Sequence, residues 1–237
     1  MKLTEVIREF SVTEPLSSED HKTYREYEAL AMLRFLLPER FSSLRKSEAP
    51  DLQDTEHSLG VEVTWGGSQD DELISGESIK YSRAKTDEER EKILNKIREH
   101  GGDRNEISTT YPVGTSEKDK MNIEKAFRKK LKKAERYRKK FDHLGVVIMV
   151  DIPMIFFDVD FDWRAWFSEI NERSSSKYDF VVLSHWSGID LYDFKTREYI
   201  QKRIDREDRR ALCKLARMAT EGIIKDNDPV WSNLQNI

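Results

Sequence analysis

The chain has 237 residues, of which 37% are hydrophobic and 36% are charged, and its net charge is −4. This length supports one large domain or two small ones with a real core, and 24 aromatic side chains argue against a disordered chain. Only ten glycines exclude a collagen-like protein. Because Cys213 is the single cysteine, disulfide frameworks and cysteine zinc sites are excluded. The N-terminal sequence lacks the apolar run of a signal peptide, and we expect a cytoplasmic protein that does not span a membrane.

Periodicity and turn residues predict ten elements along the chain. Ser17 or Ser18 is a good N-cap for the first helix, and Pro38 ends it. Alternation of apolar and polar residues marks the strand over 59–65. The predicted elements are a helix over 18–37, strands over 51–53 and 59–65, helices over 86–99 and 116–141, a strand over 144–150, a helix over 161–171, strands over 180–184 and 189–194, and a helix over 196–223.

This order of elements predicts an α/β fold in which helices flank a mixed central sheet, with a long C-terminal helix. We expect a single domain over residues 1–237, interrupted by a polar insertion or lid at about 68–116.

Positive charge is concentrated in the long helix that begins near Ser116. Residues 118–141 contain twelve Lys or Arg and three Asp or Glu, a net charge of +9 that leaves −13 for the rest of the chain. One basic face on an acidic molecule is compatible with a polyanionic partner such as nucleic acid. A helix face that is simply solvated gives the same pattern, and on charge alone it is the favoured interpretation.

Two carboxylates are predicted to converge on the strand over 59–65. Val61 and Val63 point to one face of this strand, so Glu62 points to the other. If the strand over 51–53 pairs with it as a hairpin, Asp51 lies beside Glu62. Neighbouring carboxylates repel unless a proton or cation intervenes, and a hard cation such as Mg²⁺ binds such oxygen ligands.

A lysine and a glutamate on helices complete the predicted cluster. Lys130 falls in the middle of the apolar stripe of its helix, so it either extends toward solvent or contacts a carboxylate. Glu28 falls closer to the buried side of the first helix than Glu26, although a surface glutamate is the simpler interpretation. The apolar stripe of the helix that carries Lys130 consists of Ile123, Ala126, Phe127, Ala134, Tyr137 and Phe141.

Pro50-Asp51 followed by Glu62-Val63-Thr64 resembles the motif of the PD-(D/E)XK nuclease superfamily. The strand, strand, helix, strand order is also similar to the restriction-endonuclease-like α/β/α core, and the resemblance covers about residues 18–185. The family pattern has a lysine where Thr64 stands. Lys130 is the replacement that a lysine supplied from the following helix would use, with Lys133 and Lys80 as weaker alternatives.

The resemblance implies a metal-dependent nuclease that hydrolyses phosphodiester bonds in nucleic acid, with DNA as the expected partner. It implies Mg²⁺, replaceable by Mn²⁺, held by Asp51, Glu62 and the Val63 carbonyl. Glu28 would bind a second ion or a metal-bound water, and Lys130 would orient the nucleophile or stabilise the phosphate. The residues expected to contact the nucleic-acid backbone are Arg128, Lys129, Lys132, Lys133 and Arg136.

Two other classes stay open. Thr64 in place of lysine favours a catalytically inactive nuclease fold that serves as a binding or scaffold protein. A helical interaction protein would use the long charged helix instead. The sequence does not distinguish DNA from RNA or a monomer from a homodimer.

Overall fold

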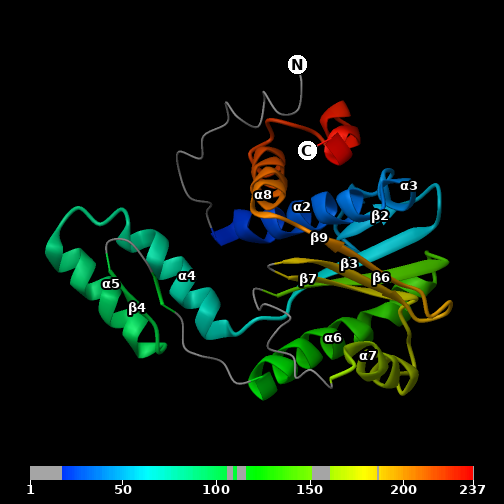
Figure 1. The fold of residues 1–237 in the computed structure, drawn as a ribbon, viewed down its shortest axis with the longest axis horizontal. Coiled ribbons are helices and arrows are strands. Elements are labelled where there is room, and N and C mark those ends of the chain that lie inside the picture. The colour runs from blue at the N-terminus through cyan, green and yellow to red at the C-terminus, as the bar shows by residue number, and fades with distance from the viewer. Residues whose placement is uncertain (1–17, 106–108, 111–115, 151–160, 186, 237) are drawn as a thin grey trace.

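The computed structural model describes residues 18–105, 109–110, 116–150, 161–185 and 187–236 (Figure 1). The helices are α2 (Ser18–Leu36), α3 (Pro38–Phe41), α4 (Gln69–Tyr81), α5 (Asp87–Glu99), α6 (Ser116–Arg138), α7 (Trp163–Glu172), α8 (Arg206–Thr220) and the 3₁₀ helix η2 (Pro229–Asn236). The strands are β1 (Arg45–Lys46), β2 (Leu52–Asp54), β3 (Leu59–Trp65), β4 (Asp103–Arg104), β5 (Thr109–Thr110), β6 (His143–Met149), β7 (Phe180–His185), β8 (Gly188–Asp193) and β9 (Tyr199–Arg203).

Seven strands form one mixed sheet in the order β1-β2-β3-β6-β7-β8-β9. β3, β6 and β7 run parallel at its centre, and the pairs on either side are antiparallel. Parallel neighbours require a crossover connection, and α6 and α7 lie in the two crossovers. The predicted mixed sheet flanked by helices is therefore confirmed.

Helices cover both faces of this sheet (Figure 1). On one face, side chains of α2 and α8 pack with Val61 and Val63 of β3. On the other face, side chains of α6 and α7 pack with Val146 and Ile148 of β6. Because side chains alternate along β3, Glu62 faces the α6 layer. The sequence therefore predicts correctly that Val61 and Val63 point to one face of the sheet and Glu62 to the other.

The predicted C-terminal helix over 196–223 is wrong in its first part. Residues Tyr199–Arg203 form β9, which pairs antiparallel with β8, and α8 begins only at Arg206. Asp205 ends the strand segment, because its side chain caps the helix by accepting the Glu207 and Asp208 backbone N–H groups at 2.7 and 2.8 Å. The C-terminal helix is therefore 15 residues long.

The polar segment between β3 and α6 is more regular than its sequence suggests. The predicted helix over 86–99 corresponds to α5, and α4 precedes it as a helix that the sequence did not indicate. Ile74 of α4 and Ile97 of α5 are fully buried where these two helices pack. Figure 1 shows α4, α5 and β4 to one side of the central sheet. At the start of α4, Asp70 forms an ion pair with Lys118 of α6 at 3.6 Å.

None of the helices in the described ranges is both long and apolar enough to cross a membrane.

Candidate functional site

Asp51 and Glu62 lie side by side because of the register of the β2–β3 hairpin. Leu52 pairs with Val61, so the residue before Leu52 is placed opposite the residue after Val61. Directly opposed residues point to the same face of a sheet. Both carboxylates are buried, with residue exposures of 5% for Asp51 and 1% for Glu62.

The ammonium of Lys130 contacts both carboxylates from α6. Its Nζ lies 3.1 Å from Asp51 Oδ2 and donates a second hydrogen bond to Glu62 Oε2. Lys133, one helical turn further, places its Nζ 3.4 Å from the same Glu62 oxygen while its side chain stays 44% exposed. We call Asp51, Glu62, Lys130 and Lys133 the lysine–carboxylate cluster. It combines two negative and two positive charges at a mostly buried site.

Neighbouring groups fix the positions of these side chains. The Val63 backbone N–H donates to Asp51 Oδ2 at 2.8 Å. Because the N–H and C=O of one residue in a strand point the same way, the Val63 carbonyl also faces the Asp51 edge of β3. The Lys130 backbone carbonyl on α6 accepts a hydrogen bond from the Tyr178 hydroxyl at 3.0 Å within the core. Hydrogen bonds from β3 and from the segment between α7 and β7 thus hold Asp51 and Lys130 in place.

The electrostatic influence of Glu62 extends to two tyrosines that the sequence did not single out. Burial, followed by a hydrogen bond to the Glu62 carboxylate, raises the pKa of Tyr137 to about 12. Burial and then the Glu62 charge also raise the pKa of the Tyr178 hydroxyl. Arg136 donates to the Tyr137 hydroxyl at 3.1 Å. Tyr137 belongs to the predicted apolar stripe, which gives no indication of this polar role.

The contacts described for Glu28 are with α8 and not with the lysine–carboxylate cluster. Its Oε1 lies 3.6 Å from Cys213 Sγ and 3.9 Å from an Arg209 guanidinium nitrogen, both on α8. These two contacts place the Glu28 carboxylate against α8, and neither involves Asp51, Glu62 or Lys130. The sequence could not resolve this point, because the second half of α2, from Ala29 on, is apolar on nearly every side and is buried in the core.

Glu26 is the glutamate of α2 that faces the Asp51 region. Glu28 is two positions further along the helix, which places the two side chains about 200° apart around its axis. Glu26 is 3% exposed and pairs with Lys46 at 3.2 Å and with Lys22 at 3.4 Å. The negative charges of Glu26 and, more weakly, Asp51 raise the pKa of Lys22, so this face of α2 lies near the cluster.

The remaining basic candidates lie in two places. Lys80 is in the insertion, where it pairs with Glu77 at 2.5 Å, and no contact given for it involves Asp51 or Glu62. Arg128 pairs with Glu124 of its own helix at 2.6 Å. All five residues expected to contact a nucleic-acid backbone are exposed on α6, namely Arg128, Lys129, Lys132, Lys133 and Arg136.

The donor set of the cluster fits a divalent cation of the magnesium type. Mg²⁺ is commonly held by one or two protein carboxylates and completes its shell with water and phosphate oxygens. Glu62 Oε1 is buried and accepts no hydrogen bond within the described residues by geometric criteria, while the Tyr137 hydroxyl lies close to the same carboxylate. Within the described ranges, no group of three or more His, Cys, Asp or Glu side chains is placed to hold a metal ion, so a cation here would have only Asp51 and Glu62 as carboxylate ligands.

No family model, curated protein or solved structure matches this chain. The functional argument therefore depends on the geometry of the cluster and on the charges around it.

Proposed function

We propose that this protein is a metal-dependent nuclease that hydrolyses phosphodiester bonds in nucleic acid, with DNA as its first substrate class. The observation that carries the proposal is the contact of one buried ammonium, that of Lys130, with Asp51 and Glu62. These residues come from a hairpin and a helix 68 to 79 positions away along the chain. The resemblance to the PD-(D/E)XK motif predicts the same three residues together.

In this proposal Asp51 and Glu62 hold the cation, with the Val63 carbonyl on the same edge of the sheet. When bound, Mg²⁺ or Mn²⁺ supplies a polarised phosphate and a water of lowered pKa. Lys130 replaces the motif lysine that Thr64 does not provide, and its ammonium stabilises charge that grows on the phosphate. Lys133, which contacts Glu62 and is half-exposed, reaches the same phosphate from solvent.

The second candidate function is a nuclease fold without catalysis, used as a binding or scaffold protein. Burial favours it, because Asp51, Glu62 and Lys130 are each no more than 9% exposed. In this interpretation the three charged side chains form an ion-pair network that holds α6 against the sheet. The two candidates differ in whether the carboxylates take up a metal ion.

A cleavage assay distinguishes them. Purified protein is incubated with single- and double-stranded DNA and RNA in Mg²⁺ or Mn²⁺, with and without chelator. We expect metal-dependent cleavage that Glu62→Gln reduces about 100-fold or more, since it removes one charge from the metal site and preserves its shape. Glu28→Gln is the matched control, because its carboxylate contacts α8 instead.

Two results would decide against the proposal. A broad substrate panel left uncut, together with no Mn²⁺ uptake by calorimetry, would favour the non-catalytic fold. Cleavage undiminished in Glu62→Gln would assign the activity to another site or to a contaminant.

A further inference from the structure

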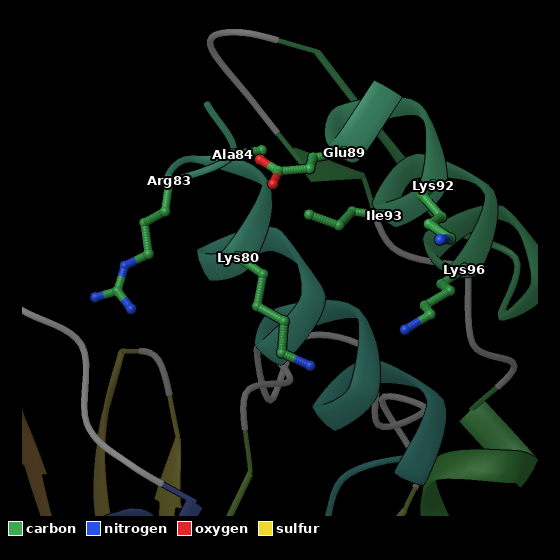
Figure 2. Close-up of a pocket in the computed structure, with 7 residues that line it drawn as sticks. All are labelled: Lys80, Arg83, Ala84, Glu89, Lys92, Ile93 and Lys96. Atoms are coloured by element: carbon green, nitrogen blue, oxygen red, sulfur yellow. The ribbon is translucent and has the colours of Figure 1, made fainter. Parts of the chain in front are cut away.

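A groove between α4 and α5 of the insertion is lined mainly by basic side chains. It has a volume of about 340 Å³. Figure 2 shows Ile93 and Lys96 of α5 pointing toward α4 and Lys80 extending toward the same end of the groove, whereas Arg83 extends away from α5. The seven residues that line it are Lys80, Arg83, Ala84, Glu89, Lys92, Ile93 and Lys96.

The positive charge of this groove is a local feature and does not follow from composition. Residues 69–104 contain ten Asp or Glu and eight Lys or Arg, so the segment as a whole is acidic. The groove lining has four basic residues and one acidic residue. That acidic residue, Glu89, has a structural role, since its Oε2 accepts the Lys85 backbone N–H at 2.9 Å at the start of α5.

A largely buried carboxylate holds two of the groove lysines side by side. Glu77, whose side chain is 13% exposed, pairs with Lys80 at 2.5 Å and with Lys96 at 3.9 Å. The pair with Lys96 joins α4 to α5, whereas the pair with Lys80 lies within α4. Among the residues that the structure describes, no carboxylate lies within ion-pairing distance of Lys92 or Arg83. The groove therefore presents cations whose charge is not matched by nearby acids.

Because the groove is open to solvent, a polymer that runs along it is a better match as ligand than a small molecule that must be enclosed. Lys80, Arg83, Lys92 and Lys96 are all exposed, although most of the surface inside the groove is apolar and Ala84 and Ile93 also line it. Small-molecule sites usually bury most of their ligand within apolar walls. Exposed cations along a groove instead match the repeated charges of a phosphate backbone.

We propose that this groove binds the phosphate backbone of the nucleic acid on which the nuclease acts, as a second contact surface separate from the basic face of α6. The inference rests on the proposed function, because it assigns a further phosphate site to the same substrate class. The insertion follows β3, the strand that carries Glu62, and its α4 begins beside Lys118 of α6. A nucleic acid bound to both surfaces would therefore follow the length of α4, because residues at and just beyond its C-terminal end line the groove.

The test measures DNA affinity at several salt concentrations by fluorescence anisotropy, with the full chain and a 30-base-pair duplex. Lys92→Gln/Lys96→Gln removes two groove cations without placing new acids beside Glu77. Each lost phosphate contact lowers the slope of log K against log salt by roughly 0.9, so we expect a decrease of about 1.8 and weaker binding. Lys92→Gln alone leaves the Glu77 ion pairs intact, and we expect about half that decrease.

Lys85→Gln/Arg90→Gln is the matched control, because it removes two cations from the same segment outside the groove lining. Unchanged binding by the control supports the groove. Equal losses in both double variants, or no loss in either, would overturn it. So would displacement of the duplex by a mononucleotide at equal phosphate concentration, which would indicate a small-molecule site.

The binding and cleavage measurements together distinguish failure of the groove proposal from failure of the proposed nuclease function. A groove variant that binds normally, with cleavage still abolished by Glu62→Gln, rejects the groove and keeps the nuclease. Groove-dependent binding without any metal-dependent cleavage keeps the groove and rejects the nuclease.

Discussion

The ammonium of Lys130 lies 3.1 Å from the Asp51 carboxylate, although 79 positions separate the two residues in the chain. The contact joins α6 to the edge of the β2–β3 hairpin inside the protein. Burying charges costs free energy unless they are paired and hydrogen-bonded, and here Lys130, Val63 and Lys133 supply the donors. The Lys130 ammonium lies between the two carboxylates, in the region where a divalent cation held by both of them would also lie.

Lys130→Met tests how much this ammonium stabilises the fold. The substitution keeps a long apolar side chain and leaves Asp51 and Glu62 buried without their main counter-charge. We expect the free energy of unfolding to fall by about 3–5 kcal/mol, measured by urea denaturation without divalent ions. Lys132→Met, on the exposed face of the same helix, is the control and is expected to change stability little.

The same variant tests metal binding independently of catalysis. A cation that binds the folded state stabilises it by about 2.7 kcal/mol at 100 times its dissociation constant. We expect Mg²⁺ to raise the melting temperature of Lys130→Met more than that of wild type, because the cation takes over the role of the missing ammonium. No response to Mg²⁺ in either protein would favour a purely structural ion-pair network.

The sequence predicts the cluster well because its information is local. Alternation in β3 fixes the faces of Val61 and Glu62, the hairpin register brings in Asp51, and the apolar stripe of α6 identifies Lys130. Each of these steps depends on a short period of two or 3.6 residues. The same reasoning gives the central strands and the helices that flank them.

Long-range packing accounts for what the sequence does not predict. α2 is buried against both the sheet and α8, so periodicity alone does not show that Glu28 faces α8 while Glu26 faces β1. β9 carries charged and polar residues such as Lys202, and its strand conformation depends on pairing with β8. Edge strands of this kind resemble helical or loop sequence until their partner is known.

Cys213 provides a readout for the position of Glu28. Burial and then the Glu28 carboxylate raise the pKa of the Cys213 thiol to about 12. Glu28→Gln removes that negative charge, so we expect a lower thiol pKa and faster reaction with a thiol reagent at pH 8 to 9. Metal-dependent cleavage is expected to stay near the wild-type level. A Glu28→Gln protein with unchanged thiol reactivity and lost cleavage would return Glu28 to the metal site.

Tyr137 is expected to make stability depend on pH in the alkaline range. Its pKa is about 12 in the folded protein and about 10 in an unfolded chain. Between these values the unfolded state loses the proton first, so the stability present below pH 10 is lost as the pH rises toward 12. In Tyr137→Phe we expect the free energy of unfolding to decline less steeply, by up to about 1.4 kcal/mol per pH unit. Identical slopes in both proteins would show that Tyr137 keeps an ordinary pKa.

The basic face of α6 is expected to provide affinity and not chemistry. Lys129 and Lys132 are exposed and lie outside the lysine–carboxylate cluster. In Lys129→Glu/Lys132→Glu we expect weaker DNA binding and a log K against log salt slope that is smaller by about 1.8, since two phosphate contacts are lost. At saturating DNA the cleavage rate should remain close to wild type, because Asp51, Glu62 and Lys130 are unchanged. A lower rate at saturation with unaltered affinity would place these lysines at the reacting phosphate.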